Sequence, residues 1–403
     1  MRKFSLFAII MLCLAILVVD GLAFYWLRSI TKLIDAPAWI VVVNFAFWVF
    51  TVGLISAILI LKVRLDSISV HSKQLWISSL YGLTVSSFIP KILFVIVVSI
   101  LHGANFVLVD KASLIVIAVI GLLAGFLPFF AILFGIFKTV YSFKIHHKTI
   151  RFEHLKPSFG GLQIVQISDL HLGSFNYRYT VLDRAVKIIN DLEPDIIVFT
   201  GDLVNNYAWE LKGWDSVLSK LTAKGGKFAI LGNHDYGDYS EWKTEGKKQQ
   251  NFENIKDFFP KIGFKLLLNE SKIITFKGQD IALIGVENWG KPPFKQYGNL
   301  EKALENVKDI SLKILLSHDP THWTEEVVNQ NDIALTLAGH THGMQAGIDL
   351  GNIKWSPIQY KLKHWAGLYQ QSNQSLYVNR GLGWLGFPGR IGMRPEITVI
   401  ELE

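Results

Sequence analysis

Cysteine is almost absent from this 403-residue chain, which contains a single one, Cys13. One thiol cannot form a disulfide framework, and it cannot supply the several thiolates of a structural zinc site. A metal site in this chain must therefore be built from histidine, carboxylate and amide side chains.

Acidic residues are scarce in the first part of the chain. Residues 1–150 contain 12 Lys or Arg but only four acidic residues, whereas the remaining 253 residues contain 28 basic and 29 acidic ones. The formal charge of +7 thus comes from the first part, and the rest is close to neutral. Because nucleic-acid enzymes carry a basic excess around their sites, we do not expect nucleic acid as a partner.

Charged side chains are missing altogether from two long stretches of the first part. Each stretch is longer than the roughly 20 residues needed to cross a bilayer. Two further apolar stretches are interrupted, one by Asp20 and the other by Pro90 and Lys91. We predict an all-α transmembrane domain over residues 1–141, with helices at about 4–27, 38–61, 76–102 and 112–137.

The loop charges predict the orientation of these helices. With the N-terminus inside, the outer loops carry three basic residues, Arg28, Lys32 and Lys111. The inner flanks then carry Arg2, Lys3, Lys62, Arg64, Lys73, Lys138, Lys144, Lys148 and Arg151. The positive-inside rule therefore predicts a multi-pass protein of the cell (inner) membrane with both termini in the cytoplasm. The alternative is a signal peptide over the first apolar stretch, which would leave three spans and reverse the orientation.

Two charged residues fall inside the predicted spans. Asp20 lies about two thirds of the way outward along the first helix, and Lys91 a little over halfway outward along the third. Because isolated charges at these depths are costly, one hypothesis is that the two pair between helices. The other hypothesis is that each side chain reaches to the outer interface.

Five short motifs in the second part of the chain carry polar side chains of a restricted kind. Each follows directly on a stretch that is typical of a buried strand, and polar groups placed there point into the crevice where α/β sheets bind ligands. The motifs are Asp169-Leu170-His171, Gly201-Asp202, Gly232-Asn233-His234-Asp235, Ser317-His318-Asp319 and Gly339-His340-Thr341-His342.

These residue types favour the hydrolysis of phosphate esters by two metal ions. Two cations roughly 3.5–4 Å apart clamp a phosphate and lower the pKa of a bridging water, which makes a nucleophile at neutral pH. Mixed Asp, His and Asn ligands suit Mn, Fe, Zn or Co, whereas an all-oxygen set would indicate Mg or Ca. We predict a site for two divalent ions of the first kind.

From about Lys156 to its end the chain resembles the calcineurin-like metallophosphoesterase family, in its membrane-anchored subgroup. The family pattern is D-x-H, G-D, G-N-H-D/E, H and G-H-x-H, and all five blocks are present in that order. The resemblance implies that one metal is held by Asp169, His171 and His342, and the other by Asn233, His318 and His340. It also implies that Asp202 bridges the two metals.

The same resemblance implies a catalytic role for His234, which would assist the leaving group or contact the phosphate, with Asp235 orienting it. One position departs from the pattern. Relatives in this subgroup often read G-H-T-H-G-G-Q, and Met344 stands at the second glycine of that pair. Because Gly reaches positive φ easily and Met does so at a cost, the local backbone or a substrate contact is in question there.

The catalytic domain is predicted over residues 157–403, after a basic and aromatic connector at 142–156. Its strands and helices alternate in an order that fits two sheets face to face with helices outside, a mixed α/β and α+β arrangement. The resemblance implies the same four-layer αββα sandwich. We expect His146 and His147 to face lipid headgroups, and residues 236–254 to form a mobile loop over the site.

A glycine-rich stretch near the end of the chain offers candidates for substrate contact. Arg380, Arg390 and Arg394 are the candidates for binding phosphate, although loop arginines are more often solvated or paired with carboxylates. Trp384, Leu385 and Phe387 are candidates for contact with acyl chains, and packing against the domain is the alternative.

The predicted function is a membrane-bound phosphoesterase that cleaves a phosphodiester or pyrophosphate bond. The expected substrate is lipid-linked, of the UDP-2,3-diacylglucosamine type found in the lipid A pathway. The first alternative is a phosphodiesterase for soluble nucleotides or other small diesters. The second is a membrane sensor or transporter with a non-catalytic nucleotide-binding domain, which predicts that metal ligands are missing.

Overall fold

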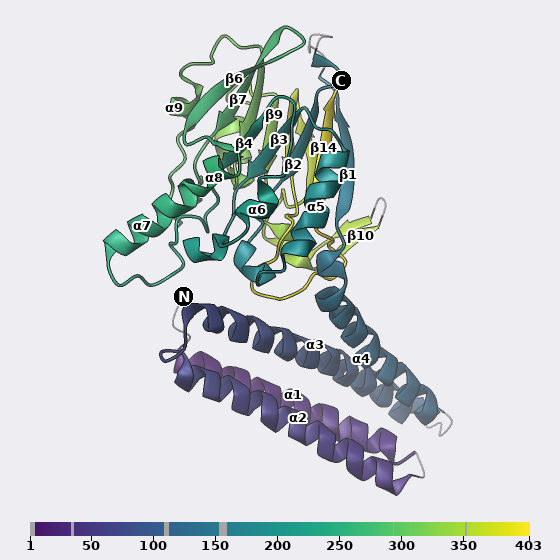
Figure 1. The fold of residues 1–403 in the computed structure, drawn as a ribbon. Coiled ribbons are helices and arrows are strands. Elements are labelled where there is room, and N and C mark those ends of the chain that lie inside the picture. The colour runs from purple at the N-terminus through teal and green to yellow at the C-terminus, as the bar shows by residue number, and fades with distance from the viewer. Residues whose placement is uncertain (1–4, 34–35, 109–112, 153–158, 293, 351–352) are drawn as a thin grey trace. The chain divides into compact units, whose positions relative to one another are not determined.

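The computed structural model describes residues 5–33, 36–108, 113–152, 159–292, 294–350 and 353–403. Contacts within the chain divide it into two compact units, which are drawn in Figure 1. One unit comprises residues 3–137 with 386–389, and the other comprises residues 138–385 with 390–403. Each unit is described by itself.

The first unit is all helical. Its helices are α1 (Leu6–Thr31), α2 (Pro37–Arg64), α3 (Val70–Leu108) and α4 (Ser113–Phe137). Four helices of the described residues are long and apolar enough to cross a membrane, which confirms the predicted number of spans. α3 is longer at both ends than the predicted 76–102, and, as predicted, it continues through Pro90. Transmembrane helices tolerate such a proline when the freed backbone groups find other partners.

The predicted pairing of Asp20 with Lys91 is confirmed. Lys91 Nζ lies 2.8 Å from Asp20 Oδ1, and the Asp20 residue is only 1% exposed. The other carboxylate oxygen of Asp20 accepts a hydrogen bond from Thr51 Oγ1. Asp20, Thr51 and Lys91 belong to α1, α2 and α3, so one buried polar cluster joins three helices.

Exchanging the two charges tests what this pair contributes. We expect Asp20→Ala or Lys91→Ala to lower the thermal stability of the purified protein in detergent, because each leaves a charge that costs about 2.5–3.5 kcal/mol inside a span. The double variant Asp20→Lys/Lys91→Asp should recover part of that loss. If it melts no higher than the worse single variant, the two side chains do not stabilise each other.

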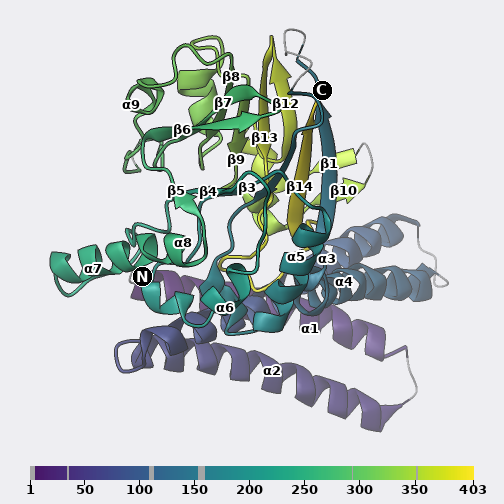
Figure 2. The ribbon, with the colours of Figure 1, turned by 45° about the horizontal axis from the view of Figure 1, so that its top comes forward.

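The second unit contains two sheets that pack face to face, seen in Figures 1 and 2. The first sheet has the order β1 (Lys144–Ile150), β14 (Glu396–Leu402), β2 (Gln163–Ile167), β3 (Ile196–Thr200), β4 (Lys227–Ile230) and β5 (Lys265–Leu266). The second has the order β12 (Gly367–Gln371), β13 (Gln374–Val378), β9 (Leu335–Ala338), β8 (Leu312–Leu316), β7 (Gln279–Gly285) and β6 (Glu270–Phe276). A separate hairpin is formed by β10 (Ile348–Leu350) and β11 (Ile353–Trp355).

The buried apolar side chains fall into layers that match this arrangement. One cluster joins the two sheets, with Ile164 and Val198 on one side and Ile314 and Leu335 on the other. A second cluster lies between the first sheet and the helices α5 (Tyr179–Asp191), α6 (Asp215–Leu218) and α8 (Phe258–Lys261). A third lies between the second sheet and α9 (Leu300–Leu304). The predicted αββα sandwich is therefore present.

α5 shows why the sequence forms the outer layer. Its buried residues are Leu182, Ala185, Val186 and Ile189, at the spacing that places side chains on one face of a helix. The opposite face is polar, so this helix covers the sheet and faces solvent. Parallel pairing of β2, β3 and β4 then brings their carboxyl ends to one edge.

Two segments differ from the sequence-based expectation. Residues 144–150, expected within the connector, form β1, an edge strand parallel to β14 in which His146 is half-buried and His147 is exposed. Residues 245–256, expected largely as loop, form α7, whose first turn is capped by Thr244. Both segments are polar, and their regular structure depends on partners that lie far away in sequence.

Candidate metal centre

The five motifs converge because the five strands before them run parallel within two sheets that pack face to face, β2, β3 and β4 in the first and β8 and β9 in the second. Asp169, Asp202 and Asn233 follow β2, β3 and β4, and His318 and His340 follow β8 and β9. The backbone turns sharply at these points. Positive φ angles occur at five of the expected ligands: Asp169 (51°), His171 (45°), Asp202 (60°), His340 (74°) and His342 (50°). Such strain costs about 1–3 kcal/mol per residue and is typical of functional sites.

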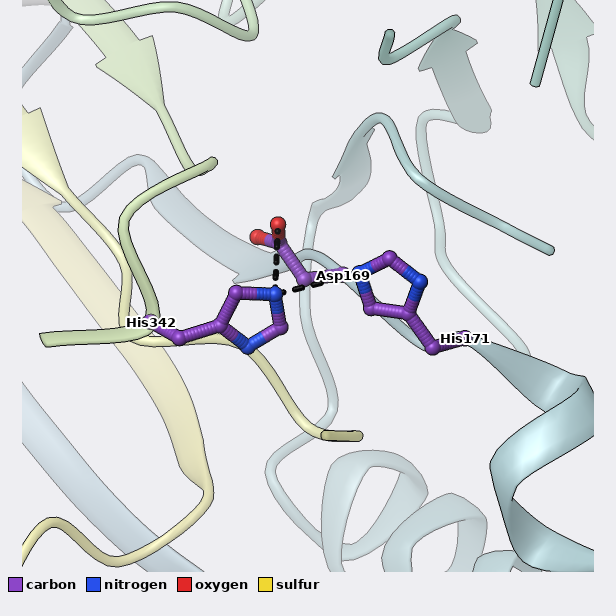
Figure 3. Close-up of side chains that lie close together, drawn as sticks. All are labelled: Asp169, His171 and His342. Atoms are coloured by element: carbon purple, nitrogen blue, oxygen red, sulfur yellow. Dashed lines mark hydrogen bonds and ion pairs between the residues drawn. The ribbon is translucent and has the colours of Figure 1, made fainter. Parts of the chain in front are cut away.

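The first group of ligands consists of Asp169, His171 and His342, which point toward one another in Figure 3. His342 Nε2 lies 3.3 Å from Asp169 Oδ1 and 3.1 Å from His171 Nε2. All three side chains are buried. Burial lowers the pKa of His171 to about 3, so its ring is neutral and offers a lone pair. A carboxylate and neutral imidazoles around one point fit a divalent cation.

The second group consists of Asp202, His318 and His340, and Asn233 adjoins it. Asn233 Oδ1 lies 3.1 Å from His318 Nε2 and 2.9 Å from His340 Nδ1. The other ring nitrogen of His318, Nδ1, lies 2.7 Å from the carbonyl oxygen of Thr200. That contact fixes the imidazole so that Nε2 faces the group, as an outer partner does in metal sites.

Asp202 belongs to both groups. Its Oδ2 lies 3.2 Å from His318 Nε2 in the second group and 3.5 Å from His171 Nε2 in the first. Burial alone would raise the pKa of Asp202, but the neighbouring His318 and His234 hold it well below its usual value. Its carboxylate therefore stays charged between two sets of ligands. Burial raises the pKa of Asp169 to about 7.

His234 lies beside the first group, and its ring packs edge-on against that of His171 with centroids 5.1 Å apart. Its Nδ1 lies 2.8 Å from the carbonyl oxygen of Asn205, which leaves Nε2 as the nitrogen able to act on a substrate. The ring of Tyr239 stacks on the other side at 4.6 Å. The hydroxyl of Tyr239 accepts a hydrogen bond from Asn233 Nδ2 at 2.9 Å, which turns Asn233 Oδ1 toward the second group.

Asp235 does not take the role that the resemblance implied. Its buried carboxylate accepts hydrogen bonds from the backbone N–H groups of Gly232, Asp202, Leu203 and Val204 at 2.9–3.2 Å. It therefore fixes the loop that carries Asp202, while the carbonyl of Asn205 orients the imidazole of His234. Neither Asn205 nor Tyr239 had a signal in the sequence, because one contributes a main-chain oxygen and the other lies in an irregular loop.

The arginines expected to contact phosphate are engaged within the protein. Arg380 is buried and paired with Glu396 at 2.5 Å. Arg390 is buried, with Nη2 2.8 Å from the carbonyl oxygen of Arg380 and 3.3 Å from His342 Nδ1. Arg394 donates to the carbonyl oxygens of Ser142 and Phe143. Their contacts in the structure are thus with the protein itself, and Arg390 lies beside the ligand His342.

For Trp384 the structure shows the packing alternative, because its side chain is buried and packs against Phe175 with ring centroids 4.6 Å apart. A buried indole of this kind belongs to the core of the domain.

Met344 adopts the backbone conformation that the family's usual glycine would adopt. Its φ is 57° and its side chain points outward, with 53% of the residue exposed. We expect Met344→Gly to raise the stability of the protein by about 1 kcal/mol, because Gly reaches this region without strain. Thermal unfolding would measure the change. Met344→Ala is the matched control, since it removes the side chain and keeps the strain, and an equal gain there would contradict this account.

Comparison with known proteins agrees with this geometry. The sequence pattern of the family "Calcineurin-like phosphoesterase" matches residues 162–344. The pattern "Probable Calcineurin-like phosphoesterase, transmembrane domain" matches residues 2–140.

Similar curated proteins come from bacteria and animals. The uncharacterized metallophosphoesterase YkuE of Bacillus subtilis (strain 168) is 32% identical over 265 residues, which cover 63% of this chain and 84% of that protein. The transmembrane protein with metallophosphoesterase domain of Bos taurus is 32% identical over 262 residues, 62% of this chain and 54% of that protein. The phosphodiesterase YaeI of Escherichia coli (strain K12) is 27% identical over 257 residues, 62% of this chain and 86% of that protein. The match thus spans about half of the bovine protein.

Proposed function

Because the chain belongs to the calcineurin-like phosphoesterase family, we propose that this membrane-associated metal-dependent hydrolase cleaves a phosphodiester or pyrophosphate bond of a lipid-linked substrate. The observation that carries the reaction class is the position of Asp202, whose Oδ2 lies within 3.5 Å of a histidine nitrogen in each of two ligand groups. A carboxylate oxygen shared by two groups suits a pair of cations, and the other oxygen, Oδ1, accepts a hydrogen bond from the backbone N–H of His234 at 2.9 Å.

The chemistry of the centre follows from its residues. Asp169, His171 and His342 would hold one divalent ion, Asn233, His318 and His340 the other, and Asp202 both. Such ions neutralise phosphoryl charge and supply hydroxide at neutral pH. His234, held through Nδ1 by the carbonyl of Asn205, presents Nε2 to a phosphoryl oxygen or to the leaving group. Asp235 keeps the loop of Asp202 in place through its four N–H contacts.

Three observations support a diester or pyrophosphate that is held by the membrane. A relative is named a phosphodiesterase, which favours a diester over a monoester. Four apolar helices exceed what a tether requires. The residues after 150 carry no basic excess, which argues against nucleic acid. A substrate of the UDP-2,3-diacylglucosamine type, from the lipid A pathway, combines these features. The basic inner flanks support a position of the centre on the cytoplasmic face of the inner membrane.

The test is a substrate comparison with the purified full chain in nanodiscs and added Mn²⁺. We expect faster hydrolysis of a UDP-diacylglucosamine-type lipid embedded in the disc than of soluble nucleotide diesters. Asp202→Asn is the control for contaminating hydrolases. Faster hydrolysis of the soluble diesters would favour the nucleotide phosphodiesterase, and no hydrolysis of any phosphate ester would favour a non-catalytic sensor.

A further inference from the structure

The β10–β11 hairpin has one face made of apolar side chains that no part of the described chain covers. In its antiparallel register Ile348 lies opposite Trp355, and Leu350 lies opposite Ile353. Directly opposed residues share a face, so these four side chains lie together. Their exposed fractions are 43%, 39%, 72% and 65%, respectively. We call this set of four the apolar hairpin face.

The opposite face of the hairpin is polar and is fixed to the catalytic unit. Asp349 is paired in register with Lys354, and its Oδ2 lies 3.4 Å from Arg380 Nη2 and 3.5 Å from Lys144 Nζ. His146 Nε2 of β1 lies 4.0 Å from the same oxygen. The hairpin cannot rotate its apolar face inward without removing Asp349 from these cationic partners.

Figures 1 and 2 both show β10 projecting beside the edge of the first sheet that carries β1. The apolar face is therefore presented outward by a defined set of ion pairs. Four adjacent exposed apolar residues are costly in water, and such patches usually mark an interaction surface.

The residues around the apolar hairpin face are those that favour a bilayer interface. Tyr360 and Met344 are also exposed, and Trp355 Nε1 lies 3.4 Å from the Tyr360 hydroxyl. Trp and Tyr prefer the headgroup level of membranes, where an apolar ring and a polar group are both satisfied. Lys361 and Lys363 are exposed beyond Tyr360 and would attract anionic headgroups.

The covalent chain brings a bilayer within reach of this hairpin. α4, an apolar span, ends at Phe137, and β1 begins at Lys144 after six intervening residues. A fully extended segment of that length covers roughly 25 Å at most. Lys144 contacts Asp349 of the hairpin. The base of the hairpin therefore lies within this length of chain from the end of an apolar span. A soluble partner would instead have to reach the hairpin by diffusion.

We propose that the apolar hairpin face inserts into the headgroup region of a phospholipid bilayer and thereby orients the metal centre at the membrane surface. Five residues separate the ligand His342 from Ile348, so the docked hairpin sets the distance between the centre and the lipid. This inference goes beyond the proposed function, because a metal centre docked on the membrane is compatible with either a lipid or a soluble substrate.

A single label on the full chain tests the insertion. In a Cys13→Ser background, which removes the one native thiol, Ile353→Cys carries an environment-sensitive fluorophore, and Ile273→Cys is the matched control. Ile273 lies in β6, which forms a hairpin with β7, and is 41% exposed. The proteins are placed in nanodiscs of phosphatidylcholine and phosphatidylglycerol, at one chain per disc.

We expect the label at 353 to be quenched by spin-labelled lipid and to show an iodide quenching constant about fivefold lower than the label at 273. Equal access of iodide to both labels overturns the proposal. Protection at 353 without quenching by lipid also overturns it and indicates a protein partner. Protection that appears only with two chains per disc indicates self-association instead.

Asp202→Asn separates this proposal from the proposed function. The substitution should abolish hydrolysis while leaving the lipid quenching at 353 unchanged. Leu350→Glu, which places a charge on the apolar hairpin face, should weaken that quenching, and Ile273→Glu should leave it unchanged.

Discussion

Asp202→Asn is expected to lose both metal ions and nearly all hydrolytic activity. Asp202 Oδ2 is the ligand atom shared by the two groups, at 3.5 Å from His171 Nε2 and 3.2 Å from His318 Nε2. An amide in its place has no negative charge and presents at most one oxygen. Removing a residue that hydrogen-bonds to a metal ligand lowers metal affinity or activity about 10–100-fold. Removing the shared ligand itself should therefore lower activity by more than about 100-fold.

The measurement is the metal content per chain, by elemental analysis after dialysis, together with turnover of a diester. Asp183→Asn is the matched control, because Asp183 is a carboxylate of the same unit that lies on the outer helix α5 and pairs with Lys220. Turnover at the wild-type level with both metals retained would show that Asp202 does not bridge the centre.

The candidate site could be predicted from sequence to the extent that its determinants are local. Asp169, Asp202 and His340 each follow a short buried strand, so their convergence follows from parallel pairing within each sheet and from the face-to-face packing of the two sheets. The transmembrane helices were equally accessible, because length and the absence of charge are local properties.

The surroundings of the site could not be predicted from the sequence in this way. Arg380 and Arg390 lie in a glycine-rich stretch that resembles an exposed loop, and their burial depends on Glu396 and on carbonyl groups within the folded loop. β1 has the sequence of a basic connector, and it becomes a strand because β14, about 250 residues later, pairs with it.

His234→Ala is expected to retain both metals and to lose turnover by about 10²–10⁴-fold, the usual contribution of a positioned acid or base. The side chain is not among the seven expected ligands, and its contacts are the Asn205 carbonyl and the rings of His171 and Tyr239. Removing it therefore leaves each ligand group intact. Because the carbonyl oxygen at Nδ1 is an acceptor, it favours a proton on Nδ1 and leaves Nε2 as the nitrogen that exchanges a proton with a leaving oxygen.

Two measurements check this division of roles. Metal content should equal that of the wild-type protein, and metal loss equal to that of Asp202→Asn would contradict it. Diesters with good and poor leaving groups then distinguish the two actions of His234. Proton donation matters most when the leaving alcohol is a poor one, so the loss should be larger for an alkyl diester than for a nitrophenyl diester. An equal loss for both would assign His234 to stabilising charge on the phosphoryl oxygens instead.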